Sequence, residues 1–163
     1  MQLHIGGNND ADSCFDSMND PEIARPLSGL LDYFEAKGNL PKIILYPQNP
    51  KDNYVIASIA GKFQSKIPGK IQFGLGWRFN DHKDAISEQL KAIANAGVIS
   101  KFIGMTTDSY SPMGYVRHEY FRRIVCNLLG SWVDGGEYPD DIDMLGKIAM
   151  DICYRNAKKY FNF

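Results

Sequence analysis

The feature that most constrains the fold is a fourfold alternation of short apolar segments with helical segments. We predict strands over four ranges: Gln2–Ile5, Lys42–Tyr46, Lys70–Gly74 and Lys101–Thr107. The second of them, KIILY, is apolar throughout after its first residue, which is typical of a parallel strand covered on both faces. The alternation therefore predicts an α/β fold of parallel βα units joined by right-handed crossovers.

Turn and capping residues predict where the helices begin and end. Pro21 follows an aspartate at one predicted helix start, and Gly38 is placed to end that helix. Pro50 follows an asparagine in the same way before the next helix. Apolar residues at helical spacing then predict a helix from about Lys83 to Ala96. Each predicted helix thus follows a predicted strand after a loop, which for the first unit is the long polar segment Asn8–Asn19.

The fourth unit carries the most suggestive residue. Asp108 comes where the apolar run Phe102–Thr107 stops, and Ser111 with Pro112 predicts the start of the following helix. A carboxylate at the carboxyl end of a strand that feeds a helix is where α/β enzymes place their chemistry. These residues alone leave two interpretations open: a catalytic carboxylate, or an aspartate that only caps a turn.

Size and composition exclude several classes of protein. A chain of 163 residues with 44% hydrophobic residues fits one domain over residues 1–163. A net charge of −1 gives no reason to expect nucleic acid or an anionic membrane as a partner, and the apolar runs are too short to span a bilayer. The cysteines Cys14, Cys126 and Cys153 lack metal-site spacing, which favours reduced thiols in a cytoplasmic protein.

Several motifs resemble one enzyme family. Residues Gly104–Ser111 read GMTTDSYS and Tyr115–Arg123 read YVRHEYFRR. They resemble the last barrel strand of uronate isomerases, members of the amidohydrolase superfamily, where the pattern runs close to G-M-x-T-D-S-R-S and then Y-x-R-H-E-Y-F-R-R. Met1–Gly6, Leu40–Tyr46 and Ile67–Gly74 resemble other strands of that family. The resemblance implies the C-terminal half of a (β/α)₈ TIM-type barrel, strands five to eight, without the first half.

The resemblance also implies a reaction and a site. Uronate isomerases interconvert aldose and ketose hexuronates, D-glucuronate with D-fructuronate and D-galacturonate with D-tagaturonate, at a divalent metal that is commonly zinc. On this basis Asp108 is expected to be catalytic and a metal ligand, and Trp77 and His4 are expected to bind substrate. From the residues alone, Trp77 also reads as a loop aromatic and His4 as a hydrogen-bonded histidine at a strand end.

Three departures from the family pattern bear on activity. Tyr110 stands where the family has an arginine, and a phenol cannot make the two-pronged contact of a guanidinium with a carboxylate. The loop Gly7–Phe15 is shorter than in the family and lacks its arginine–asparagine cluster. No H-x-H pair is present, whereas a catalytic zinc site typically has three protein ligands. We therefore expect the isolated chain to be inactive without the N-terminal half.

Two further expectations concern partners and alternative functions. A half barrel leaves unpaired strand edges and an apolar concave face, which predicts pairing with the missing half-barrel or self-association. A non-catalytic assembly or sugar-acid-binding module is the alternative to an enzyme part. A flavodoxin-like binding domain is disfavoured because no glycine-rich phosphate loop follows any predicted strand.

Overall fold

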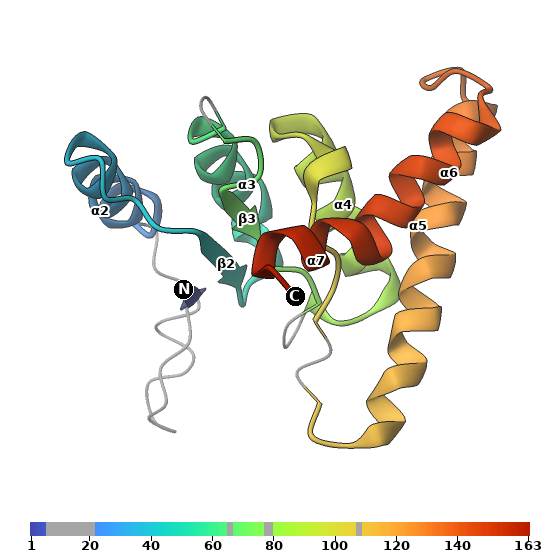
Figure 1. The fold of residues 1–163 in the computed structure, drawn as a ribbon, viewed down its shortest axis with the longest axis horizontal. Coiled ribbons are helices and arrows are strands. Elements are labelled where there is room, and N and C mark those ends of the chain that lie inside the picture. Colours follow the sequence, from blue (N-terminus) through green and yellow to red (C-terminus); the bar gives the residue numbers. More distant parts are fainter. Residues whose placement is uncertain (6–21, 65–66, 77–79, 107–108) are drawn as a thin grey trace.

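A computed structural model describes residues 1–5, 22–64, 67–76, 80–106 and 109–163. Within these residues a parallel sheet has three strands in the order β1 (Gln2–Ile5), β2 (Ile43–Pro47) and β3 (Ile71–Phe73) (Figure 1). Leu45 of β2 lies in register with Leu3 on one side and with Phe73 on the other. The prediction of parallel βα units is confirmed. The predicted helix start at Pro21 lies outside the described residues.

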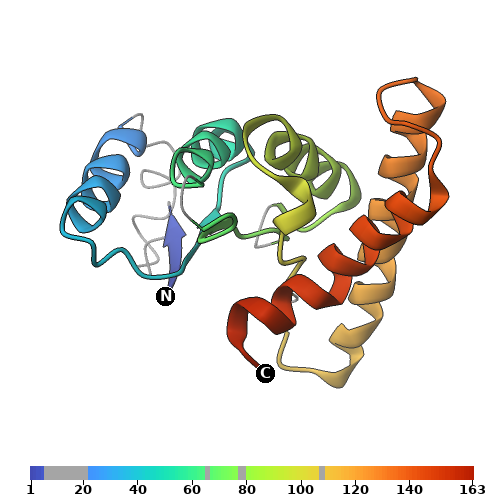
Figure 2. The ribbon, with the colours of Figure 1, turned by 45° about the horizontal axis from the view of Figure 1, so that its top comes forward.

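Three helices lie in a row along one side of the sheet, as both ribbon views show (Figures 1 and 2). They are α2 (Ala24–Ala36), α3 (Asn53–Lys62) and α4 (Lys83–Ala96). The bounds of α4 are those that the sequence predicts. Gly38 adopts a φ of 69° just after α2, the left-handed conformation that glycine provides at helix ends.

The predicted caps form at the helix starts. Asn49 Oδ1 accepts a hydrogen bond from the Lys51 amide at 3.0 Å, at the start of the 3₁₀ turn Pro50–Asp52 that leads into α3. Ser111 Oγ accepts from the Met113 amide at 3.3 Å, before the 3₁₀ turn Pro112–Tyr115. These caps satisfy amides that have no partner within the helix.

The carboxyl-terminal helices fold back toward the strands. Helix α5 (Val116–Asp134) is followed by α6 (Ile142–Met150), a π-helical turn (Asp151–Arg155) and α7 (Asn156–Phe161), which ends near the strands (Figures 1 and 2). Tyr160 Oη donates to the carbonyl oxygens of Ile43 at 3.3 Å and Lys70 at 3.0 Å. Helix α7 is therefore fastened at the amino-terminal ends of β2 and β3. In the described part of the chain, no helix has the length and apolarity needed to cross a membrane.

Alternate residues of β2 face two different environments. Ile43 and Leu45 belong to the large core shared with α3 and α4, whereas Ile44 and Tyr46 form a separate small cluster with side chains that include Tyr160. Side chains of successive strand residues point to opposite faces, so this division places α7 on the face opposite the helix row.

The fourth predicted strand is only partly realised. Residues Ile99–Lys101 form a 3₁₀ turn, and the described residues after it contribute one isolated parallel bridge, between Leu75 and Met105, rather than a ladder. Gly104 interrupts the extended conformation with a φ of 85°. The carbonyl oxygens of Ser100 and Phe102 accept hydrogen bonds from Asn156 Nδ2 at 2.8 and 2.9 Å. A side chain of α7 thus occupies acceptors that a strand partner would otherwise use.

Candidate functional site

The candidate site is the edge of the sheet where the parallel strands end. In parallel βα folds this edge collects the loops that bind ligands. His4, predicted to bind substrate, is the penultimate residue of β1 and lies in register with Tyr46 of β2. Trp77 and Asp108 lie outside the described residues, so their contribution to the site stays a prediction.

The described residues that precede Trp77 and Asp108 lie side by side. Leu75 forms the parallel bridge with Met105, and a Cβ added at Gly76 would lie 2.8 Å from Met105 Cγ and 3.6 Å from the Thr106 carbonyl oxygen. The chain therefore approaches both predicted site residues from adjacent points of the same edge. This adjacency agrees with a shared site.

His4 rests on a buried aromatic ring. Its imidazole stacks on the ring of Tyr46, with 5.0 Å between centroids and 26° between planes. Tyr46 is 1% exposed, while His4 is exposed at the sheet edge. A side chain at Gly74, the residue after β3, would overlap the Tyr46 ring, so glycine is required there for the ring to pack against the backbone. Tyr46 thus supports an accessible imidazole that can donate to or accept from a ligand.

Sequence reasoning missed the role of Tyr46. It treated this residue as one more apolar member of a buried strand. The sequence shows only that Tyr46 carries a polar group near the carboxyl end of its strand; its place on the same face as His4 follows from the strand register.

A buried amide network fixes the loop that leads to Trp77. Gln89 of α4 is fully buried; its Oε1 accepts from the Gly76 amide at 3.2 Å, and its Nε2 donates to Asn53 Oδ1 at 3.3 Å. Buried amides are stable only when hydrogen-bonded, so the network holds Gly76 to α3 and α4. The signal in the sequence was a glutamine, Gln89, three positions after Ile86 on the otherwise apolar side of the predicted helix.

Asn80 connects two loops of the same edge. Its side chain is fully buried, and Nδ2 donates to the carbonyl oxygens of Pro47 at 3.0 Å and Gln48 at 3.3 Å. The next residue, Asp81, forms an ion pair with Arg117 at the start of α5. The edge is therefore braced across β2, β3 and α5.

The described residues do not assemble a metal site by themselves. Nowhere in the described ranges do three His, Cys, Asp or Glu side chains gather closely enough to hold an ion. His4 can supply one imidazole ligand at this edge, whereas a catalytic zinc typically needs three protein ligands. The expected metal role of Asp108 stays a prediction.

Tyr110 projects into solvent. The residue is fully exposed, next to a hollow of about 230 Å³ whose other walls include Ser111 and Tyr115. A phenol placed in this way supplies no cation for a sugar carboxylate.

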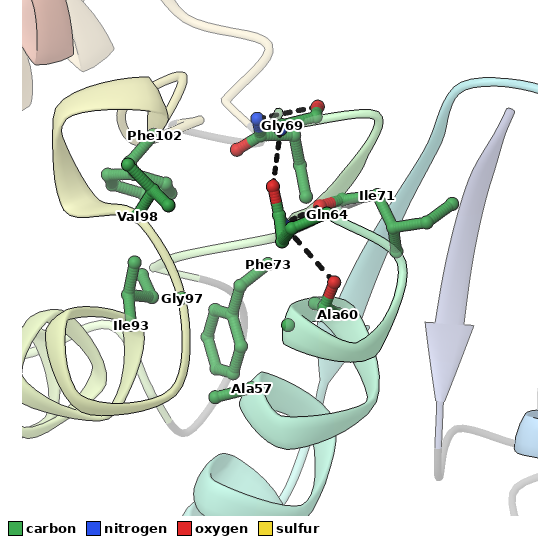
Figure 3. A pocket seen from close by; sticks show the side chains of 12 residues that line it. Ala57, Ala60, Gln64, Gly69, Ile71, Phe73, Ile93, Gly97, Val98 and Phe102 are labelled. Atoms are coloured by element: carbon green, nitrogen blue, oxygen red, sulfur yellow. Dashed lines mark hydrogen bonds between the residues drawn. The ribbon is translucent and has the colours of Figure 1, made fainter. Parts of the chain in front are cut away.

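A second hollow lies between α3, α4 and β3, but it is too small for a metabolite (Figure 3). Its volume is about 20 Å³, which is room for roughly one water molecule. The Gln64 amide fills its polar side: Nε2 donates to Ala60 and Ile71 carbonyl oxygens at 3.2 and 3.3 Å, and Oε1 accepts from the Gly69 amide at 2.5 Å. This hollow is a packing feature rather than a binding site.

Comparison with known proteins points to one family. The family model for glucuronate isomerase matches residues 3–161. The uronate isomerase of Bacillus subtilis is 60% identical over 153 residues, which cover 93% of this chain and 32% of that protein. The uronate isomerase of Caldicellulosiruptor bescii is 53% identical over 174 aligned positions, covering 100% of this chain and 38% of that protein. The chain thus spans about a third of the length of these relatives.

The fold agrees with the sequence comparison. The crystal structure of uronate isomerase from Thermotoga maritima matches with a TM-score of 0.79 and 30% identity, over 98% of this chain and 36% of that chain. The match confirms the predicted fold class, parallel βα units that form part of a (β/α)₈ barrel. Because the family model matches residues 3–161, almost the whole of this chain, the chain belongs to the uronate isomerase family.

Proposed function

We propose that this chain forms the carboxyl-terminal part of a uronate isomerase barrel and takes part in hexuronate isomerisation only together with the rest of the barrel. The observation that carries the proposal is the pair of coverages in the structural match, 98% of this chain but 36% of the Thermotoga maritima enzyme. The reaction in question is the interconversion of D-glucuronate with D-fructuronate, and of D-galacturonate with D-tagaturonate.

The residues of this chain would act at the carboxyl edge of the sheet. Aldose–ketose isomerisation moves a proton between adjacent carbons and needs groups that hold the two oxygens during the transfer. The exposed imidazole of His4, supported by Tyr46, suits a contact with a substrate hydroxyl or carboxylate. Trp77 is proposed to flank the sugar, and Asp108 to move a proton or to hold a divalent metal, zinc by family resemblance.

Such a metal would need further ligands from outside the described residues, since these hold no cluster of three candidate ligands. When bound, a zinc ion would polarise the substrate oxygens. This requirement is why the proposal makes activity depend on a complementing half-barrel.

The sheet itself supports a partner. β1 is hydrogen-bonded only to β2 within the described sheet, and Gln2 and His4 are exposed. Open strand edges pair readily with another chain. The favoured partner is the N-terminal half-barrel, with self-association as the second choice, in the cytoplasm.

A complementation assay tests the proposal. The chain is mixed or co-expressed with the part of the Bacillus subtilis enzyme that precedes the matched region, and D-glucuronate consumption is followed with added Zn²⁺. We expect no turnover from either part alone, turnover from the mixture, and loss of that turnover in Asp108→Asn. Asp140→Asn, which changes an exposed carboxylate after α5, is the matched control. Full turnover by Asp108→Asn would refute its assigned role.

The alternative is a sugar-acid-binding or assembly module without catalysis. Tyr110 favours it, because the missing guanidinium would otherwise bind the uronate carboxylate. Calorimetric binding of D-glucuronate by the chain, with no turnover in any mixture and no dependence on Zn²⁺, would support this module over the enzyme part.

A further inference from the structure

A larger hollow lies outside the candidate site, at the opposite end of the strands. It is a pocket of about 330 Å³ at the amino-terminal ends of β2 and β3. This volume is within the range of small-molecule sites. Four lysines line it, Lys42, Lys70, Lys101 and Lys159, and among the residues that the structure describes no acidic side chain lines it.

The regularity of the fold explains why the lysines converge. Lys42 directly precedes β2, and Lys70 directly precedes β3. Lys101 directly precedes the segment whose Met105 forms a parallel bridge with Leu75, two residues after β3. Because these segments run parallel, residues before each of them meet at one edge. Lys159 is added from α7, which is fastened at the same edge through Tyr160.

The charge gathered here is local rather than a result of composition. The whole chain has 18 basic and 19 acidic residues. Lys42 Nζ donates to the Tyr160 carbonyl oxygen at 2.7 Å, and Lys70 Nζ lies 3.9 Å from a carboxylate oxygen of Glu35. With the residues that the structure describes, neither Lys101 nor Lys159 forms an ion pair. Lys101 and Lys159 therefore bring two like charges to the pocket without a counter-charge among the described residues, and like charges repel one another, so this arrangement favours an anion in the pocket.

The walls that carry the lysines are held rigidly. Gln72 Nε2 donates to the carbonyl oxygens of Gly69 and Lys101 at 2.8 and 2.9 Å. Asn156 Nδ2 binds the carbonyl oxygens on either side of Lys101, those of Ser100 and Phe102. Polar side chains thus tie β3, the following segment and α7 together, which keeps the lysine backbones in place before a ligand arrives.

We propose that this pocket binds the phosphate group of a small phosphorylated molecule, at a site separate from the hexuronate edge. Lysine ammonium groups bind phosphate as point charges, and a dianion can be shared among several of them. A pocket without arginine suits this chemistry better than two-pronged carboxylate recognition. The proposal does not depend on Asp108 or on isomerase activity.

Thermal unfolding and calorimetry of the full chain test the proposal, with inorganic phosphate and glucose 6-phosphate as probes and NaCl at matched ionic strength as the reference. At about ten times Kd, phosphate should raise Tm by roughly 4 °C. The variant Lys101→Gln/Lys159→Gln should weaken binding at least about tenfold. Lys51→Gln/Lys147→Gln removes the same charge from exposed positions outside the pocket and should bind as the wild type does.

Each variant is first checked for an unchanged circular dichroism spectrum, so that a lower affinity in calorimetry reports weaker binding rather than poor folding. Tighter binding of glucose 6-phosphate than of phosphate would extend the proposal to phosphate esters, and equal binding would restrict it to the phosphate group. The proposal would be overturned if NaCl raised Tm as much as phosphate does, or if both double variants lost the same amount of phosphate affinity. The proposal would also be overturned if the protein bound D-glucuronate and the Lys101→Gln/Lys159→Gln variant, but not the control, lost that binding. Self-association that depends on these lysines, without any binding of phosphate, would overturn it as well.

Discussion

The two faces of the sheet differ in how completely this chain covers them. On the face toward α3 and α4, Ile43 and Leu45 are fully buried in a core that also takes in Phe73. On the opposite face, Ile44 and Tyr46 are covered in a small cluster near α7, and His4 stays exposed. The helices of the βα units cover the face toward α3 and α4, whereas α7 covers the opposite face only near the amino-terminal ends of the strands.

The difference follows from how a barrel is built. Helices that follow each strand cover the outer face locally, but the inner face is filled by side chains from all the strands together. This chain spans about a third of its relatives' length, and its inner face is covered less completely than its outer face. The carboxyl-terminal helix supplies a partial substitute through Tyr160.

The largest expected effect is on the helix-covered face. Leu45→Ala should lower the free energy of unfolding by about 3 kcal/mol, because it leaves a cavity in a close-packed core. Ile44→Ala, on the same strand but the opposite face, should cost about 2 kcal/mol, since its cluster is smaller and open to the lysine-lined pocket. Urea denaturation of both variants measures the difference. A larger cost for Ile44→Ala would contradict the contrast between the faces.

A second prediction concerns the close contact between the segment that contains Gly104 and the π-helical turn Asp151–Arg155. Gly104 has a φ of 85°, and a Cβ there would lie 2.7 Å from the Ile152 carbonyl oxygen. Gly104→Ala should therefore cost about 2 kcal/mol from backbone strain and a clash with backbone. Gly130→Ala in α5, where nothing lies within 4 Å, is the control and should be neutral or slightly stabilising. Equal urea midpoints for the two variants would refute the argument.

The sequence predicted what depends on local pattern. Strand alternation, the helix bounds Lys83–Ala96 and the caps at Asn49 and Ser111 all reflect residues within a few positions of one another. The regular fourth strand was not obtained, because its acceptors are taken by Asn156, more than fifty positions away. A side-chain contact at that separation has no local signature.

The site shows the same limit. His4 could be placed at the functional edge because its strand could be predicted. Tyr46 and Gln89 were missed, since each acquires its role from a residue of another element: Tyr46 lies across Gly74, and Gln89 holds Gly76. Only tertiary packing brings such partners together.

A third prediction tests how α7 closes the open face. Tyr160→Phe removes the hydroxyl that donates to the Ile43 and Lys70 carbonyl oxygens and should cost about 1 kcal/mol at neutral pH. Burial, and to a smaller extent the neighbouring Tyr46, raises the pKa of the Tyr160 hydroxyl above its ordinary value of 10.0. Above pH 10 the unfolded chain loses this proton while the folded chain keeps it, so stability falls as the pH rises.

The wild-type protein should therefore lose stability above pH 10 more steeply than Tyr160→Phe, and the gap between the two should narrow there. Urea midpoints on either side of that pH measure it. Parallel pH curves would show that Tyr160 ionises equally in both states, and that α7 does not bury it.

The smallest expected effect lies on α5, away from both faces. Glu119 accepts from Arg122 Nη2 at 2.6 Å and from Arg123 Nε at 3.1 Å, and these contacts, with Arg122 first, lower the pKa of its carboxyl group below the ordinary 4.5. Its stabilising contribution is thus present above pH 4.5 and is lost as the pH falls through the lower folded-state pKa.

Glu119→Gln should lower the urea midpoint slightly at pH 7 and low salt, and about 0.5 M NaCl should remove the difference by screening. Because Glu119 is exposed, the same substitution should leave the contrast between Leu45→Ala and Ile44→Ala unchanged. The prediction would be wrong if Glu119→Gln lowered the urea midpoint by the same amount at low and high salt, or if it changed the difference between Leu45→Ala and Ile44→Ala. Either result would mean that the stability of α5 is coupled to the packing on the faces of the sheet.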